Sequence, residues 1–482
     1  MSVAPLAREL AAICGDGNVL THGDQLRTYE SDALLHLRVR PELVVLPDTA
    51  EEVRRVVRSC HEAGVPWVAR GAGTGLSGGA LPVEGGVVIV LSRLRSILEV
   101  DLPNARVVVE PGVTNLDVSR AVAPTHFFPP DPSSQTVCTI GGNVAENSGG
   151  AHCFKYGFTT NYVTGLDLVL PDGDVVTLGG KEVDRPGLDL LGAFVGSEGT
   201  LGVATRVVLR VVPVPADTRT LVAYFDEMEA AGQTVSDIVA EGIVPGAIEI
   251  MDRLSLRAAE QATAAGNPDV AAALVVELDG PAEECEARTA AVVALCERNG
   301  ASGLRVARDE AERALIWRAR RAAFAAMGRI SPSYYVQDSV IPRTRLAEVL
   351  GRIDELAREY GFPVANVFHA GDGNLHPLVA YDAREPGQAE RAEELSGRIV
   401  LACVDAGGSI TGEHGVGLDK KRYMGAMFSE ADLSAFQKLR CAFDPLQRAN
   451  PGKVMPTPRL CGEVPGPYRQ HPLEAAGLAE RF

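Results

Sequence analysis

RGAGTGLSGG, residues 70–79, lies between two apolar segments, residues 65–69 and 87–91, which predict strands. Its glycines permit backbone angles and close approaches that other residues disfavour. Residues 73–78 match the G-x-G-x-x-G dinucleotide pattern, but a Rossmann fingerprint must open a helix, and residues 80–86 leave no room for one. We therefore expect a tight loop whose backbone N–H groups bind phosphate, and neither a flexible linker nor a nicotinamide site.

A βαβ unit precedes this loop. Residues 43–46 predict a strand, and Thr49 with Glu52 predicts a capping box that opens a helix. The helix leads into the strand at residues 65–69. The loop therefore follows the second strand of an α/β subdomain.

Two further glycine-rich stretches follow. One, at residues 128–150, contains FPPDPS, TIGGN and NSGG, and the other, VGSEGTLG at residues 195–202, leads into a strand at residues 203–212. Prolines stiffen such loops, and glycines let the backbone approach a flat, bulky ligand. The three loops together predict one large nucleotide-bearing cofactor.

The pattern changes after residue 215. Apolar strands now alternate with longer helices, among them residues 227–241, 282–298 and 309–325. This alternation predicts an α+β cap domain in which helices cover one face of a mainly antiparallel sheet. The last helix carries several arginines, most of which we expect to be solvated. One or two that face the cleft would bind a carboxylate in bidentate fashion.

Two glycine-rich turns carry candidate metal ligands. HAGDGNLH, residues 369–376, places two imidazoles around a turn, and TGEHGVG, residues 411–417, supplies a carboxylate and a third imidazole. His369, His376 and Glu413 predict a zinc, manganese or iron site with open positions, which leaves His414 as a base. The alternative is that these are solvent-exposed loop histidines.

Composition limits the class of protein. The chain has 482 residues and a formal net charge of −17, without an aromatic-interleaved basic patch, so nucleic acid is an unexpected partner. Residues 1–17 lack the pattern of a signal peptide, so we do not expect secretion, and without a run of about 18 apolar residues we expect no transmembrane helix. Nine cysteines without a Cys-x-x-Cys pair predict reduced thiols in the cytoplasm and no iron–sulfur cluster. If electrons leave this protein through an iron–sulfur cluster, another chain must carry that cluster.

The glycine-rich clusters, the two histidine turns and NPGK at residues 450–453 together resemble the vanillyl-alcohol-oxidase/PCMH-type flavoproteins, in particular the D-2-hydroxyacid dehydrogenase branch. The finer match, at residues 323–335, 365–369, 450–461 and 480–482, resembles the FAD-linked D subunits of bacterial glycolate oxidases. The resemblance implies an α+β fold with a PCMH-type FAD-binding domain of two α/β subdomains and an α+β cap. The expected division is an N-terminal helical segment (1–37), the FAD-binding domain (38–215), the cap with the metal site (216–425), a return to the FAD domain (426–460) and an extended tail (461–482).

The resemblance also implies noncovalent FAD, because Thr74 stands where covalent relatives carry a histidine. Fourteen residues are implied in cofactor binding: Gly71, Gly73, Thr74, Gly75, Ser77, Pro132, Ser133, Gly142, Asn143, Ser148, Gly149, Glu198, Val203 and Asn450. Glu198 and Val203 are expected near the adenosine.

The implied reaction is oxidation of a small 2-hydroxyacid, glycolate or D-lactate, to the 2-oxoacid. Arg320 would hold the carboxylate, the metal the hydroxyl oxygen, and His414 would take the proton as a hydride passes to flavin N5. Tyr335 stands where 2-hydroxyglutarate enzymes place a lysine, which favours a monocarboxylate.

The expected partners are a second flavin-domain subunit and an iron–sulfur subunit, and contact with the inner face of the inner membrane would be made only through them. The alternatives are a stand-alone D-lactate dehydrogenase with a cytochrome or quinone acceptor and a noncatalytic electron-relay subunit.

Overall fold

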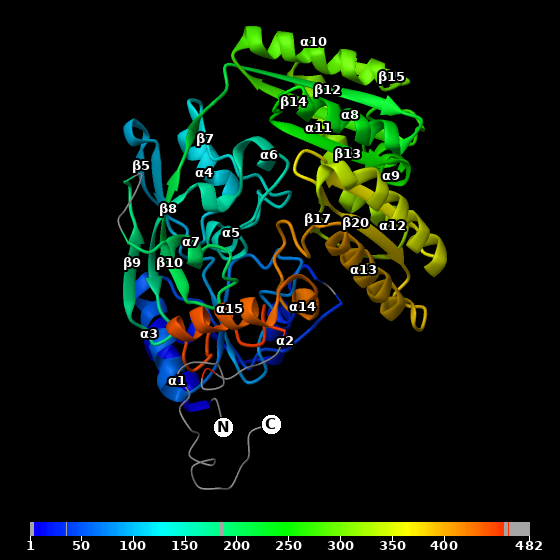
Figure 1. Cartoon of the computed structure of the whole chain (residues 1–482). Helices are drawn as coiled ribbons and strands as arrows, with labels where there is room; N and C mark the ends of the chain where they lie inside the picture. Colours follow the sequence, from blue (N-terminus) through cyan, green and yellow to red (C-terminus); the bar gives the residue numbers. More distant parts are fainter. Residues whose placement is uncertain (1–3, 35, 183–186, 457–460, 462–482) are drawn as a thin grey trace.

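The computed structural model describes residues 4–34, 36–182, 187–456 and 461. The chain forms two lobes (Figure 1). The amino-terminal half builds the lower lobe, the green and yellow segments build the upper lobe, and α15 (Glu430–Phe443) returns to the lower one.

A four-stranded sheet begins the lower lobe, in the order β1-β2-β4-β3. Strands β2, β4 and β3 run parallel. Thr49 accepts a hydrogen bond from the Glu52 amide at 3.2 Å, which confirms the predicted helix start. No helix occurs between β3 and β4, as the loop prediction requires. The elements are β1 (Val19–Leu20), β2 (Leu43–Val45), β3 (Trp67–Arg70), β4 (Val87–Val90), α1 (Ala4–Cys14), α2 (Gly23–Leu26) and α3 (Ala50–Ala63).

The second sheet of the lower lobe has the order β5-β6-β10-β8-β9 and is antiparallel throughout. Its strands are β5 (Ile97–Asp101), β6 (Arg106–Val109), β8 (Val163–Val169), β9 (Val175–Gly179) and β10 (Val203–Arg210), and β7 (His126–Phe127) pairs separately with β11 (Val212–Pro213). The helices are α4 (Asn115–Val122), α5 (Ile140–Glu146), α6 (Cys153–Tyr156) and α7 (Leu190–Phe194).

The expectation that residues 139–143 form an open loop is wrong, because α5 begins there. Thr139 accepts a hydrogen bond from the Gly142 amide at 3.3 Å and so caps the helix. Ile140 and Val144 are fully buried on its inner face. The cap and this burial outweigh the low helix propensity of two glycines.

The upper lobe is built on a nine-stranded sheet whose pairs are all antiparallel, which confirms the predicted sheet type. Its strands are β12 (Asp217–Phe225), β13 (Ala247–Asp252), β14 (Ala272–Gly280), β15 (Gly303–Val306), β16 (Ser333–Val336), β17 (Ser339–Val340), β18 (Val364–His369), β19 (Asn374–Leu375) and β20 (Pro377–Tyr381). Its helices are α8 (Met228–Ala240), α9 (Arg253–Thr263), α10 (Ala282–Arg298), α11 (Glu310–Ala326), α12 (Leu346–Tyr360) and α13 (Gln388–Asp405).

The prediction that helices cover only one face of this sheet is wrong. Helices α8, α10, α12 and α13 pack on one face, and α9 and α11 pack on the other. Along β12, Leu221 and Ala223 enter the first core, whereas Val222 and Tyr224 enter the second. Strands that are apolar on both sides need a layer of helices on each.

In the carboxyl-terminal segment, α15 packs against the lower lobe (Figure 1), and Met424 of α14 (Met424–Met427) packs with Val400 of α13 and Leu433 of α15. The Asn450 amide donates to the Trp67 carbonyl at 2.8 Å, and Lys453 Nζ donates to the Leu81 carbonyl at 2.8 Å. Cys441 and Cys461 form a disulfide, so the prediction that all cysteines are reduced is wrong for this pair. The other seven are free and buried.

Among the described residues, no helix combines the length and the apolar character that a membrane crossing requires.

Candidate active site

Two adjoining cavities lie at the junction of the lobes. The larger, about 590 Å³, is lined by residues of both lobes, and the smaller, about 180 Å³, lies among the three glycine-rich loops. Glu413 and His414 line both cavities. The second histidine turn therefore forms part of the wall where the two spaces meet.

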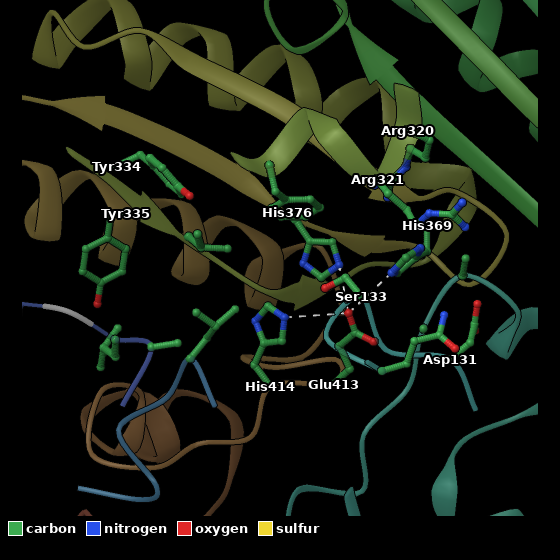
Figure 2. A pocket seen from close by; sticks show the side chains of 18 of the residues that line it. Asp131, Ser133, Arg320, Arg321, Tyr334, Tyr335, His369, His376, Glu413 and His414 are labelled. Atoms are coloured by element: carbon green, nitrogen blue, oxygen red, sulfur yellow. Dashed lines mark ion pairs between the residues drawn. The ribbon is translucent and has the colours of Figure 1, made fainter. Parts of the chain in front are cut away.

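The three predicted metal ligands converge at this wall (Figure 2). Glu413 Oε1 lies 3.4 Å from His369 Nε2 and 3.2 Å from His376 Nε2. A first-row cation with bonds of about 2.0–2.2 Å separates its ligand atoms by roughly 3.0–3.6 Å, so this donor set fits such an ion. His369 ends β18, and Gly373, at φ 78°, turns the chain back toward His376.

A buried carboxylate orients His369 from behind. His369 Nδ1 donates to Glu249 Oε1 at 2.7 Å, which leaves Nε2 to face Glu413. The Arg320 guanidinium holds Glu249 Oε2, with Nη2 at 2.6 Å and Nε at 2.9 Å. Burial favours the neutral form of Glu249, but Arg320 and His369 lower the pKa of its carboxyl below the ordinary value. A carboxylate behind a ligating histidine fixes its tautomer and ring orientation.

A second buried carboxylate, Asp338, holds the turn that carries His414. The backbone N–H groups of Gly412 and His414 donate to it at 3.0 and 2.9 Å, and Lys420 Nζ donates at 3.1 Å. The His414 ring stacks on His376, with ring centroids 5.1 Å apart. Burial lowers the pKa of His414 to about 4, although Asp338 acts in the opposite sense. His414 is therefore a neutral imidazole at neutral pH.

The smaller cavity is lined by all fourteen predicted cofactor residues except Ser77 and Gly149. A Cβ on Gly71 would lie 2.2 Å from Thr139 Oγ1, so the two loops approach as closely as glycine allows. Asn143 Nδ2 and Ser148 Oγ are buried without a hydrogen-bond partner in the described part of the chain. Such a cradle, with polar atoms to satisfy, fits a bulky polar cofactor.

Glu198 lines the smaller cavity and also has a structural role, and the adenosine contact expected for it stays a prediction. Its carboxylate accepts the backbone N–H groups of Val416 and Gly417 at 2.7 and 2.6 Å. The residue has φ 52° and is buried beside Asn450, whose Nδ2 donates to its carbonyl at 2.7 Å. Glu198 thus attaches the cofactor loop at residues 195–202 to the turn with Glu413 and His414.

Tyr335 lines the larger cavity but lies apart from the metal ligands (Figure 2). Its hydroxyl donates to the Asp419 carboxylate, and its ring lies against His36 with centroids 4.9 Å apart. The structure therefore brings Arg320 toward His369 but does not bring Tyr335 to the cluster.

Sequence reasoning missed a set of ion pairs across the two lobes. From the lower lobe, Asp131 Oδ2 contacts His152 Nδ1 at 2.7 Å. From the upper lobe, Glu277 Oε1 contacts His152 Nε2 at 3.2 Å, and Arg313 and Trp317 also donate to Glu277. The only local indication was the place of His152 directly after a glycine-rich stretch, because its partners come from distant segments.

Residues 214–454 match the family described as FAD linked oxidases, C-terminal domain, and residues 41–179 match the FAD binding domain. The chain belongs to the FAD-linked oxidase family. The glycolate oxidase subunit GlcD of Escherichia coli K12 is 48% identical over 96% of this chain and 93% of its own length. The GlcD subunit of Bacillus subtilis is 39% identical, over 94% and 97% of the two chains. D-lactate dehydrogenase of Anaerostipes hadrus is 32% identical, over 86% and 90%.

Solved structures agree with this FAD-linked oxidase fold. p-Cresol methylhydroxylase has a TM-score of 0.78 at 18% identity and covers 94% of this chain and 96% of its own. 4-Ethylphenol oxidase of Gulosibacter chungangensis has a TM-score of 0.77 at 18% identity, over 95% and 97%. The predicted PCMH-type fold, the resemblance to glycolate oxidase D subunits and the use of FAD are therefore confirmed.

Proposed function

We propose that this FAD-linked oxidoreductase oxidises small 2-hydroxymonocarboxylates, glycolate or D-lactate, to glyoxylate or pyruvate. The observation that carries the proposal is the convergence of His369, His376, Glu413 and His414 at the wall between the two cavities. A relay that only passes electrons needs neither a cation site nor a base beside its cofactor. The relatives named glycolate oxidase subunit and D-lactate dehydrogenase support the substrate class.

His369, His376 and Glu413 would hold a divalent cation, which supplies Lewis-acid polarisation of a hydroxyl oxygen when bound. FAD, held noncovalently by the predicted cofactor residues, supplies the hydride acceptor when bound. The chain itself positions a neutral His414 to take the hydroxyl proton, and Asp338 fixes the backbone of that residue. A guanidinium of α11 binds the substrate carboxylate.

We also propose that the chain divides into an FAD-binding domain at residues 38–215 and a cap domain at residues 216–425, but the end of the cap needs one adjustment. Leu418 and Asp419 already donate backbone hydrogen bonds to the Ser77 carbonyl, at 2.9 and 3.1 Å. Contact with the FAD-binding domain therefore begins before residue 425.

We further propose that this chain works beside a second flavin-domain subunit and an iron–sulfur subunit, at the inner face of the inner membrane. The word subunit in the names of two relatives supports partner chains. The second candidate function is a D-lactate dehydrogenase that acts alone, which the similarity to D-lactate dehydrogenase favours.

The decisive experiment is an anaerobic titration of the FAD-loaded chain with glycolate and with D-lactate, followed by the loss of oxidised flavin absorbance. Bleaching by glycolate is expected, and D-malate, a dicarboxylate, should bleach poorly. His414→Ala should bind flavin normally and lose reduction by about 10²–10⁴-fold, the usual contribution of a positioned base. Full-rate reduction of that variant would reject the assignment of His414. Bound flavin that no 2-hydroxyacid reduces in the unaltered chain would contradict the proposed function.

A further inference from the structure

A third cavity, of about 270 Å³, lies between α14, α15 (Figure 1) and two loops, at residues 195–202 and 409–416. We call it the α15 groove. Three of its apolar lining side chains are buried: Leu201, Ile410 and Met424. Three others, on its rim, keep 36–39% of their surface exposed: Met427, Phe436 and Leu439. Apolar side chains gathered in this way at a surface mark an interaction site.

The charges of the groove limit what can fill it. Among the described residues no carboxylate lines it, and Arg440 is its one charged side chain. Arg440 Nη2 donates to the Ala449 carbonyl at 2.9 Å, but Arg440 Nε is buried without a hydrogen-bond partner in the described part of the chain. A buried donor of this kind is uncommon in a folded protein. The groove therefore fits an occupant with an apolar face and a carboxylate beside that face.

A segment of this same chain begins next to the groove. Cys461, the last described residue, is joined by a disulfide to Cys441 of α15, which directly follows Arg440. The predicted extended tail continues from this point, and its residues 462–482 lie outside the described residues. Residues 461–472 can span up to about 36 Å when extended. Since α15, with 14 residues, is roughly 21 Å long, residues beyond 472 can reach any part of the groove.

Residues 472–482, PLEAAGLAERF, carry the pattern of a short amphipathic helix. Pro472 suits the first position of a helix. Glu474, four residues before Leu478, would flank the apolar face and offer a carboxylate. An isolated helix of this length is marginal in water, so it needs a surface to pack against. Four residues follow the i, i+3, i+4, i+7 spacing of one apolar helix face: Ala475, Leu478, Ala479 and Phe482.

We propose that residues 472–482 form an amphipathic helix that docks in the α15 groove of the same chain, with Leu478 and Phe482 packed against the exposed side chains of the rim. The disulfide holds this segment near the groove at an effective concentration on the order of mM. A small apolar contact is therefore sufficient for docking.

The docked helix would also contact two loops of the candidate active site. Leu201 belongs to the glycine-rich loop at residues 195–202, and Val416 belongs to the turn that carries Glu413 and His414. Both side chains line the groove. The carboxyl-terminal segment thus supports the loops of the wall that the two larger sites share, whichever substrate the enzyme oxidises.

The test is hydrogen exchange of the full-length, non-reduced chain, measured by mass spectrometry of peptides from residues 472–482. In the unaltered chain these amides should exchange at least about tenfold more slowly than in the free peptide of the same sequence. Phe436→Asp puts a charge on the rim of the groove, and Leu478→Asp puts one on the apolar face of the segment. Each should remove the protection. Met427→Asp, on α14, repeats the groove test from another element.

The matched control is Leu98→Asp, at a position of β5 that is 50% exposed and outside the groove, and it should keep the protection. Amides of residues 472–482 that exchange in the unaltered monomer as fast as in the free peptide would overturn the proposal and leave the groove to a partner chain. Protection that appears only as the protein concentration rises would overturn it in favour of a second copy. Protection that Phe436→Asp and Met427→Asp both leave intact would place the segment elsewhere on the molecule.

Discussion

Glu249 shows how much of this site depends on a residue that would never touch the substrate. It receives His369 on one oxygen and Arg320 on the other, and none of its surface is exposed. Both partners lie on other elements, so one carboxylate sets the relative position of β18 and α11.

Glu249→Gln retains the shape of the side chain and removes its charge. We expect divalent-cation affinity to fall by about 10- to 100-fold, the usual effect of losing the group behind a ligating histidine. Competition with a metal-binding dye measures it. The control is Glu348→Gln, because Glu348 pairs with Arg345 at the surface. Equal affinities in the two variants would show that Glu249 does not orient His369.

The predictable and unpredictable residues of the site differ in where their partners lie. His369, His376, Glu413 and His414 occur in two short turns of unusual composition, so local sequence was sufficient to predict that they meet. Glu249 was not predicted, since it occupies an apolar strand and its partners are far away in sequence. A glutamate inside AIEIMD was the available indication, because a charged residue between buried neighbours must be paired.

At the scale of elements, the first glycine-rich loop and the start of α5 support each other. Gly71→Ala would place a methyl group 2.2 Å from Thr139 Oγ1, the atom that caps α5. We expect a loss of about 1–3 kcal/mol in the free energy of unfolding of the FAD-free protein, the typical effect of overpacking. Urea denaturation measures it.

Gly75→Ala is the matched control in the same loop, because an added Cβ there meets nothing within 4 Å. It should leave the unfolding free energy of the FAD-free protein nearly unchanged. If Gly71→Ala were equally harmless, the contact between the two loops would be less tight than the structure indicates.

The upper-lobe helices α8, α10 and α11 were predicted to within a few residues, because helix caps and apolar periodicity are local signals, whereas α12 and α13 were not predicted. Asp309 accepts the Glu312 amide at 2.9 Å and begins α11 where the pattern predicted it. The presence of helices on both faces of the sheet was not predicted, since a run of apolar strand residues does not indicate whether helices will cover one face or both. The Cys441–Cys461 disulfide was missed for a similar reason, because the pairing is created by the return of the carboxyl-terminal segment.

At the scale of the whole molecule, His152 joins the two lobes and makes their association depend on pH. Burial alone would lower the pKa of His152, but Asp131 and Glu277 raise it well above the ordinary value. A histidine whose pKa is raised in the folded state stabilises the fold fully at pH values below its pKa in the unfolded chain, which is about 6.5. This stabilisation is lost as the pH rises through the folded-state pKa.

The melting temperature of the unaltered chain should therefore exceed that of His152→Leu most at acidic to neutral pH, and the difference should shrink on the alkaline side. Scanning calorimetry across that range measures it. His22→Leu, at an exposed position, serves as the control. A difference that stays constant with pH would mean that His152 acts by packing alone.

The wall shared by the two cavities would couple FAD binding to binding of the proposed cation. Glu198 lines the smaller cavity and holds the backbone just after His414, and Glu413 faces both spaces. If FAD orders this wall, it must raise the affinity for the cation, and reciprocity requires the cation to raise the affinity for FAD by the same factor. Removing the cation with a chelator should therefore weaken FAD binding. Fluorescence titration of FAD with and without the cation measures the factor by which its affinity falls. Equal FAD affinities in the two titrations would show that the sites load independently.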